Sequence, residues 1–330
     1  MATAARATPP VGRPAMAVAV APRAPAWAVD AVRRGGGTPV PAVAPGPGPA
    51  GRPPPVDGVV WLAHDDAGGL EALLAAVPGV RWVQLPSAGV DVFAPVMSAR
   101  PGMAWASASG VTAEPVAEMA VALLLAGRRG VVAATRLGAD APRTTAPVTG
   151  ERVVVVGAGA VGRAIARRLV GLGADVHVVR RSGGPVPELP TVRVWPASAL
   201  AEALADAAGV VLALPLTPAT DGLIGVAELA AMGPGAWLVN VARGRHVRTD
   251  DLVAALQDGV IAGAALDVTD PEPLAPEHPL RRLPNCVVTP HIGYGPGQVS
   301  GLLADRIAAN VRRAAAGEPL LGSVDPGRGY

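Results

Sequence analysis

The sequence contains no lysine, so all 28 of its basic residues are arginines. These arginines are interspersed with 26 acidic residues, and the formal net charge is only +2. Aromatic residues are also scarce, with six tryptophans, two tyrosines and one phenylalanine. A nucleic-acid-binding protein needs a continuous basic stripe or a platform of stacking rings. The sequence shows neither, so we expect no nucleic-acid partner.

Cysteine and long apolar runs are nearly absent as well. The single cysteine, Cys286, excludes an internal disulfide framework and is typical of a reducing cytoplasm. The longest apolar stretch, 116–126, is interrupted by Glu118 and is shorter than the roughly 18 residues of a membrane span. The first residues lack the pattern of a secretory signal. We therefore expect a cytoplasmic protein with no membrane segment and no metal site.

Half of the 330 residues are apolar, which is enough for two medium-sized domains. Residues 1–13 are rich in alanine, proline and arginine, and we expect a disordered tail. Strand-like runs ("AMAVAVAP", "GVVWLA", "VRWVQLP") then alternate with helix-like runs ("AWAVDAVRR", "GLEALLAAV"). Prolines in 41–55 exclude a helix or a central strand there and predict an extended loop. The alternation predicts a parallel α/β sheet.

A second α/β series begins near residue 109. Residues 114–129 predict a long helix that is apolar almost all round, and such a helix is buried or lies at an interface. The strand-like runs that follow are "RVVVVGAG", "DVHVV", "GVVLALPL", "AWLVNVAR", "AGAALDV" and "CVVTPHI". The chain is therefore predicted to contain two parallel-sheet α/β domains.

Three glycines directly follow the first of these strands. Gly157, Gly159 and Gly162 form a G-x-G-x-x-G pattern between four valines and an amphipathic helix. The first glycine permits a tight turn, the second lets the backbone approach a pyrophosphate, and the third allows close packing of helix on strand. In this strand–turn–helix setting the pattern predicts dinucleotide binding.

Positive charge follows the next strand. NAD-binding domains place an acidic residue about 20 residues beyond the glycines, where it binds the ribose hydroxyls. This chain has Arg180, Arg181 and Ser182 instead. Arginine suits phosphate oxygens, so the change favours NADP, with its 2′-phosphate, over NAD. A solvated arginine pair in an arginine-rich chain is the alternative interpretation.

Three further strand-like runs are each followed by a polar residue. Arg243, Glu272 and His291 come after adjacent runs, and ligands bind at the carboxyl ends of parallel strands. An arginine can clamp a carboxylate, a histidine can move a proton near neutral pH, and a carboxylate can orient that imidazole. The other histidines, including His246 and His278, are interpreted as structural.

Seven motifs in order now make the chain resemble the D-isomer-specific 2-hydroxyacid dehydrogenase family. They are "WVQLPSAGVD", "AEMAVALLLAGRR", "GAGAVGRAIARRL", "LALPLTPAT", "VNVARGR", "AALDVTDPEPL" and "TPHIGYG", from about residue 58 to the C-terminus. The resemblance implies a glyoxylate/hydroxypyruvate reductase-like enzyme. It also implies a Rossmann NAD(P)-binding domain over 109–293. A flavodoxin-like substrate domain would comprise 14–108 and 294–330, with a cleft between the two domains.

The resemblance also implies roles for individual residues. Arg243 would bind the carboxylate and carbonyl oxygen of the substrate, His291 would supply the proton, and Glu272 would pair with His291. The backbone of Ser87, Ala88 and Gly89 would bind the substrate carboxylate. Besides the glycines and the Arg180–Ser182 group, the residues implied to contact the cofactor are Ala160, Val161, Pro215, Thr217, Val241, Ala242 and Asp267.

Some positions depart from the family pattern. The segment before the glycine turn lacks the usual tryptophan and Leu-x-Gly-Lys sequence, and the first 50 residues match weakly. Arg248 stands where the family often has an aspartate, and we expect Thr249 to cap the following helix instead.

We therefore expect NAD(P)H-dependent reduction of a small 2-keto acid to the D-2-hydroxy acid, by a homodimer associating through the NAD(P)-binding domain. A phosphoglycerate dehydrogenase-like enzyme remains an alternative within the family. The alternative from another class is a non-catalytic, dinucleotide-sensing scaffold of the corepressor type. The sequence does not fix which keto acid is used.

Overall fold

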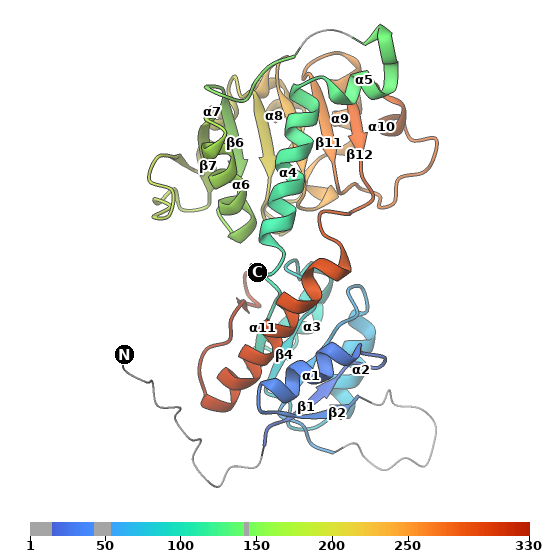
Figure 1. Ribbon diagram of the computed structural model, residues 1–330, viewed down its shortest axis with the longest axis vertical. Helices are drawn as coiled ribbons and strands as arrows, with labels where there is room; N and C mark the ends of the chain where they lie inside the picture. Colours follow the sequence, from blue (N-terminus) through green and yellow to red (C-terminus); the bar gives the residue numbers. More distant parts are fainter. Residues whose placement is uncertain (1–14, 43–53, 142–144) are drawn as a thin grey trace, which may run out of the picture. The chain divides into compact units, whose positions relative to one another are not determined.

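The computed structural model describes residues 15–42, 54–141 and 145–330, which form two compact units (Figure 1). Of these residues, unit 1 comprises those up to 86, 95–107 and 301–324, and unit 2 comprises 87–94, 108–300 and 325–330. Residues 87–94, 108, 294–300 and 325–330 group with unit 2, whereas the expected substrate domain included them. The tail expected over 1–13 lies outside the described residues.

Unit 1 contains a six-stranded sheet in the order β13-β5-β4-β3-β1-β2. Neighbouring strands are parallel except β13, which pairs antiparallel with β5. The order of the first five strands is 2-1-3-4-5, as in flavodoxin. The strands are β1 (Ala17–Val20), β2 (Thr38–Pro41), β3 (Gly58–Val60), β4 (Trp82–Gln84), β5 (Ala104–Ala106) and β13 (Ser323–Val324). The helices are α1 (Ala26–Arg34), α2 (Ala67–Ala76), α3 (Ala94–Ser98) and α11 (Pro296–Ala316); the last two start in unit 2.

Unit 2 contains a seven-stranded parallel sheet in the order β12-β11-β10-β9-β6-β7-β8. Counted from β6, this is the Rossmann order 3-2-1-4-5-6 with one added strand. The strands are β6 (Arg152–Val156), β7 (Asp175–Arg180), β8 (Arg193–Pro196), β9 (Gly209–Leu212), β10 (Trp237–Asn240), β11 (Gly263–Leu266) and β12 (Cys286–Val288). The helices are α4 (Ala113–Arg128), α5 (Val131–Leu137), α6 (Ala160–Gly171), α7 (Leu200–Leu204), α8 (Val226–Met232), α9 (Thr249–Gln257) and α10 (Pro279–Arg282). The predicted fold class, Rossmann plus flavodoxin-like, is confirmed.

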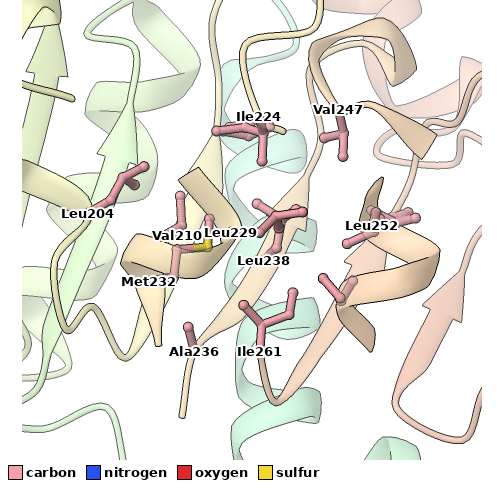
Figure 2. Close-up of a cluster of buried hydrophobic side chains, with 14 of the residues drawn as sticks. Leu204, Val210, Ile224, Leu229, Met232, Ala236, Leu238, Val247, Leu252 and Ile261 are labelled. Atoms are coloured by element: carbon pink, nitrogen blue, oxygen red, sulfur yellow. The ribbon is translucent and has the colours of Figure 1, made fainter. Parts of the chain in front are cut away.

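Apolar side chains cover both faces of the unit 2 sheet. In β6, Val153 and Val155 pack into the cluster formed with α4 and α6, whereas Val154 and Val156 point into the cluster on the opposite face. Figure 2 shows this second cluster, in which Leu229 and Met232 of α8 and Leu252 of α9 pack near Leu238 of β10. Burial on both faces explains why β6 is apolar at four consecutive positions.

The sequence patterns predicted the longer helices and the central strands of the unit 2 sheet better than short and edge strands. The helix predicted at "AWAVDAVRR" is α1, and the long helix predicted over 114–129 is α4, shifted by one residue. Strands β2, β5, β8 and β13 were not predicted. β5 and β13 are only three and two residues long. β2 and β8 are edge strands with prolines, which an edge tolerates because one side of it needs no hydrogen-bonded partner.

The expected capping role of Thr249 is wrong. Arg248 occupies the N-cap position of α9, and Thr249 is the first helical residue. The hydroxyl of Thr249 donates instead to the carbonyl oxygen of Asp270, at 2.7 Å. The first turn of α9 contains Asp250 and Asp251, whose charges complement the positive end of the helix dipole.

Arg128, at the end of α4, joins three segments at the amino-terminal edge of the unit 2 sheet. Its side chain is 8% exposed and donates to the carbonyl oxygens of Ala208 (3.3 Å), Gly235 (3.2 Å) and Pro147 (2.8 Å). These acceptors precede β9, β10 and β6, the strands that carry most of the loops described below. Burial lowers the pKa of Arg128, and the nearby Glu151 carboxylate opposes that change.

Replacing Arg128 with alanine is expected to lower the free energy of unfolding by about 2–3 kcal/mol, because buried carbonyl groups lose a charged donor. Urea denaturation at neutral pH measures the change. Arg129→Ala is the matched control, since this neighbouring arginine is exposed. Equal stabilities of the two variants would contradict the bracing role of Arg128.

Among the described residues, no helix has the length and apolar character needed to cross a membrane. In the same part of the chain, no group of three or more histidine, cysteine, aspartate or glutamate side chains is arranged to hold a metal ion.

Candidate active site

The glycine-rich turn joins β6 to α6. Gly157 has φ of +117°, and a Cβ there would lie 2.1 Å from the carbonyl oxygen of Ala213. A Cβ at Gly162 would lie 1.9 Å from the carbonyl oxygen of Gly157, whereas one at Gly159 would meet open space. No side chain caps the first turn of α6. The turn therefore presents backbone N–H groups and the positive end of a helix to an accessible space, which suits a pyrophosphate.

A cavity of about 720 Å³ lies beside this turn, within unit 2. Its volume is within the range of ligand pockets. Gly157 and Gly159 form one side, the loop after β9 from Leu214 to Thr220 forms another, and Leu200 lies on the side of α7. The residues that line the cavity are mainly apolar, which fits the adenosine half of a dinucleotide.

Arg180, Arg181 and Ser182 line this cavity at the end of β7. Arg180 donates to the carbonyl oxygens of Gly184 (3.2 Å) and Pro185 (2.9 Å), so it also shapes its own loop. Arg181 is exposed and donates to the hydroxyl of Tyr330 at 2.5 Å. Both arginines therefore lie where the adenosine ribose of a dinucleotide would be expected.

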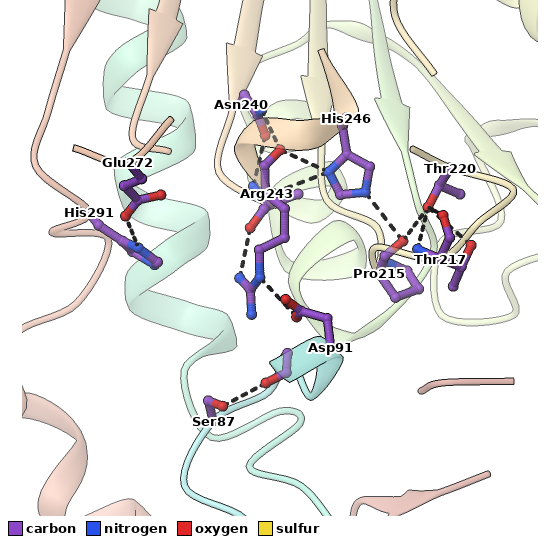
Figure 3. Close-up of polar contacts among 12 residues, drawn as sticks. Ser87, Asp91, Pro215, Thr217, Thr220, Asn240, Arg243, His246, Glu272 and His291 are labelled. Atoms are coloured by element: carbon purple, nitrogen blue, oxygen red, sulfur yellow. Dashed lines mark hydrogen bonds and ion pairs between the residues drawn. The ribbon is translucent and has the colours of Figure 1, made fainter. Parts of the chain in front are cut away.

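Arg243 follows β10, in a loop that Asn240 and His246 hold in shape (Figure 3). The Asn240 amide donates to the carbonyl oxygen of Arg243 at 2.8 Å and accepts from the N–H of Ala242 at 3.0 Å. His246 is fully buried; its Nδ1 lies 3.2 Å from the N–H nitrogen of Arg243 and its Nε2 lies 3.2 Å from the carbonyl oxygen of Pro215. Burial lowers the pKa of His246, which favours a neutral, structural imidazole.

The guanidinium of Arg243 is held from two directions. Its Nε donates to Asp91 at 3.1 Å, and its Nη1 donates to the carbonyl oxygen of Ala242 at 2.8 Å. The third guanidinium nitrogen, Nη2, lies against Gly89. A side chain at position 89 would not fit, because its Cβ would be 1.6 Å from Nη2. The hydroxyl of Ser87 donates to the carbonyl oxygen of Gly89 at 2.6 Å and stabilises this turn. The "SAGVD" segment and Arg243 therefore form one polar cluster within unit 2.

His291 and Glu272 form an ion pair on the loops after β12 and β11. The Nδ1 of His291 lies 2.7 Å from Oε1 of Glu272, and both side chains are partly exposed. His291 has φ of +53°, in the left-handed region that residues other than glycine seldom adopt. Because β10, β11 and β12 are parallel neighbours, this pair and Arg243 emerge at the same sheet edge. In Figure 3 the imidazole ring points toward Arg243.

Asp267, implied by the resemblance to contact the nicotinamide, has clear partners in the structure. It is buried, and its carboxylate accepts from the Thr289 hydroxyl and from the N–H groups of Ile292 and Gly293. Its carbonyl oxygen also accepts from the N–H of His291 at 3.0 Å. Asp267 therefore fixes the loop that carries His291; a contact with the cofactor stays a prediction.

The predicted site residues thus fall into two groups. Around the cavity lie Gly157, Gly159, Arg180, Arg181, Ser182, Pro215 and Thr217. At the ends of β10 to β12 lie Val241, Ala242, Arg243, Asp267, Glu272 and His291, with Ser87, Ala88 and Gly89 beside Arg243. Ala160 and Val161 start α6 next to Gly162 and are not among the residues lining the cavity.

Sequence reasoning missed three contributors. Asp91 lies inside the "WVQLPSAGVD" motif, but only the fold shows its contact with Arg243, 152 residues away. Asn240 ends a strand-like run, and nothing in that run indicates that its amide holds the Arg243 loop. Tyr330 carries no signal, because its partner Arg181 is 149 residues away. Cys286, in contrast, is excluded as a nucleophile, since burial raises the pKa of its thiol to about 12.

The fold and the site define a dinucleotide-dependent oxidoreductase. The family model "D-isomer specific 2-hydroxyacid dehydrogenase, NAD binding domain" matches residues 121–293. A glyoxylate reductase/hydroxypyruvate reductase of Homo sapiens is 33% identical over 254 residues, covering 74% of this chain and 77% of that protein. A hydroxyphenylpyruvate reductase of Plectranthus scutellarioides is 31% identical over 270 residues, covering 80% of this chain and 84% of that protein.

A solved structure supports the same family. A D-isomer specific 2-hydroxyacid dehydrogenase from Xanthobacter autotrophicus Py2, crystallised with NADPH and MES, superposes with a TM-score of 0.80 at 29% identity and covers 96% of this chain and 100% of that one. The chain therefore belongs to the D-isomer specific 2-hydroxyacid dehydrogenase family. Its class is that of NAD(P)-dependent oxidoreductases.

Proposed function

We propose that this protein reduces a small 2-keto acid of the glyoxylate or hydroxypyruvate type to the D-2-hydroxy acid, with NADPH as the preferred reductant. The observation that carries the proposal is the His291–Glu272 pair on the same sheet edge as Arg243, which lies against the Ser87–Gly89 turn. A proton donor and an anion-binding group together are what reduction of a keto acid requires. The named substrates of the human relative support the substrate class.

The cofactor site has a shape and chemistry that fit NADPH. The glycine turn and the start of α6 would bind the pyrophosphate, and the apolar cavity would hold the adenosine. Arg180, Arg181 and Ser182 would bind the 2′-phosphate. When bound, the reduced nicotinamide supplies a hydride to the carbonyl carbon of the substrate.

Arg243 and the turn at Ser87–Gly89 would bind the substrate carboxylate. With Nε donating to Asp91 and Nη1 to Ala242, the planar guanidinium is fixed in orientation. Its Nη2 lies against Gly89, next to the backbone amides of the turn. The positive charge would also stabilise the negative charge that develops on the carbonyl oxygen.

His291 would donate the proton that the carbonyl oxygen takes up. Glu272 accepts a hydrogen bond from Nδ1 at 2.7 Å, which orients the ring and leaves Nε2 for the substrate. Transfer of this proton completes the alcohol, and His291 is left neutral. Solvent can then reprotonate it, because its side chain is 46% exposed.

A panel of keto acids with both cofactors tests the proposal. Glyoxylate, hydroxypyruvate, pyruvate, hydroxyphenylpyruvate and phosphohydroxypyruvate would each be mixed with NADPH or NADH, and the absorbance of the reduced cofactor followed. We expect the highest kcat/KM with the two smallest substrates and NADPH. Tight NADPH binding without turnover of any keto acid would contradict an enzymatic role and favour a dinucleotide-sensing scaffold.

A charge reversal at Arg180 tests the cofactor preference. Arg180→Asp places a carboxylate where NAD-dependent enzymes bind the ribose hydroxyls, and it repels a 2′-phosphate. We expect the ratio of kcat/KM for NADPH to that for NADH to fall by about a hundredfold. Arg129→Asp is the matched control. It makes the same charge change at the end of α4, outside the cavity, and should leave the ratio unchanged. An unchanged ratio in Arg180→Asp would show that the arginine does not select the cofactor.

We also propose that two chains associate through unit 2. Helix α5, directly after α4, exposes the apolar side chains of Val131 and Leu137 at 50% and 40%. The proposed interface would cover these two exposed aliphatic side chains. Sedimentation equilibrium would give the mass of a dimer, and a monomeric mass at micromolar concentration would contradict the association.

A further inference from the structure

Residues 325–330 form a small closed loop organised by Asp325. Its carboxylate accepts from the N–H of Gly327 at 2.9 Å and pairs with Nε of Arg328 at 3.1 Å. Its carbonyl oxygen accepts from the N–H groups of Arg328 and Gly329, and its own N–H donates to the carbonyl oxygen of Tyr330. Gly329 has φ of +77°, which allows the chain to turn back. These contacts close the loop and attach the Arg328 guanidinium to Asp325.

The loop belongs to unit 2 and forms part of the wall of the cofactor cavity. Gly327, Arg328 and Tyr330 line the cavity together with Arg181 and Ser182. Tyr330 contacts Arg181 in two ways, since its hydroxyl accepts from Nη1 and its ring lies 5.7 Å from the guanidinium carbon. An arginine on a tyrosine face gains cation–π stabilisation. Tyr330 therefore holds one of the two arginines at the end of β7.

The charged side chains that line the cavity are of one sign. Among the described residues that line it, the ionisable side chains comprise three arginines (Arg180, Arg181 and Arg328), a tyrosine (Tyr330) and no carboxylate. Asp325 pairs with Nε of Arg328, which leaves the terminal nitrogens of that guanidinium to meet another acceptor. Three arginine side chains around one space, with no aspartate or glutamate among the described residues that line it, favour an anion there.

We propose that the 325–330 loop is a second recognition element for the 2′-phosphate of NADP, separate in sequence from the Rossmann core. Arg328 binds the phosphate directly. Tyr330 is a positioning residue that keeps Arg181 directed into the cavity. The inference rests on the proposed use of NADPH. It assigns a role in cofactor selectivity to residues 325–330, in addition to the glycine turn and the residues at the end of β7.

Calorimetry with two nucleotides that differ by one phosphate tests this role. The probes are adenosine 2′,5′-bisphosphate and AMP, titrated into the full-length protein without substrate, so that no turnover is needed. The wild type should bind the bisphosphate more tightly. Arg328→Ala should reduce this preference by about tenfold, as expected for one charge-assisted hydrogen bond at a solvent-exposed site, with AMP affinity unchanged.

Two tyrosine variants, an Arg181→Ala background and one control complete the set. Tyr330→Phe removes the hydroxyl and keeps the ring, and it should lower the preference by a few fold. Tyr330→Ala removes both contacts and should lower it further. In Arg181→Ala the effect of Tyr330→Phe should disappear, because Tyr330 acts through that arginine. Arg129→Ala, which removes an exposed arginine outside the cavity, should leave the preference unchanged.

The outcomes separate this inference from the proposed function. If the wild type binds both nucleotides equally, the NADPH preference fails, and the role of the loop fails with it. If the wild type prefers the bisphosphate but Arg328→Ala and Tyr330→Ala keep that preference, the loop proposal alone is overturned. Equal weakening of both nucleotides in the variants would also overturn it, since the loop would then only support the cavity wall.

Discussion

Replacing His291 with asparagine is expected to lower kcat by about three orders of magnitude, the contribution typical of a positioned general acid. Asparagine is the suitable replacement because it tolerates the left-handed backbone that His291 adopts, at φ of +53°. The loop should therefore keep its shape while losing the proton donor. NADPH affinity, measured by titration without substrate, should change by no more than about twofold.

Glu272→Gln is the companion variant. The amide can still accept a hydrogen bond from Nδ1, but it no longer favours the charged imidazole. We expect a smaller loss of kcat, about ten- to hundredfold, because the ring is still oriented but loses a charged partner. Loss of NADPH binding in parallel with turnover in His291→Asn would contradict the assigned role, because the defect would then lie in the cofactor site.

Replacing Arg243 with lysine is expected to lower kcat/KM for glyoxylate by at least about a hundredfold. Lysine keeps the charge but loses the planar fork that contacts Asp91 and Ala242 at the same time. Arg243→Ala should lose still more, and added guanidinium at millimolar concentration should restore part of its activity. Steady-state kinetics with glyoxylate measures both effects.

Asp91→Asn is the control for positioning. It leaves the arginine in place and weakens one of its two fixed contacts, so we expect a loss of about tenfold, mainly in KM. If Arg243→Lys were as active as the wild type, the guanidinium could not be the group that binds the carboxylate. If guanidinium failed to restore any activity in Arg243→Ala, the loss would reflect a changed loop structure.

Local patterns in the sequence predicted the parts of this molecule that local physics determines. Four consecutive valines indicate a strand buried on both faces. A glycine is needed next because a Cβ at position 157 would lie 2.1 Å from the carbonyl oxygen of Ala213. Because parallel strands end at one edge, the positions of Arg243, Glu272 and His291 just after strand-like runs were enough to predict that they share that edge.

Contacts between distant segments could not be predicted in this way. The Arg243–Asp91 and Arg181–Tyr330 contacts each link residues about 150 positions apart, and neither partner has a periodic or motif signature for the other. Edge strands such as β2 and β8 were missed for a related reason. Their prolines and exposed positions weaken the alternation that identifies a strand, and only pairing with a neighbour defines them.

The grouping of residues 87–94 with unit 2 has a consequence for how the substrate is bound. Arg243 and the Ser87–Gly89 turn come from opposite halves of the chain, yet both are held within one folded body through the Asp91 contact. The groups proposed to bind the carboxylate, Arg243 and the Ser87–Gly89 turn, are therefore held in place by the fold itself. An incoming keto acid need not order a loose segment to be held, so more of its small binding energy remains for aligning the carbonyl group.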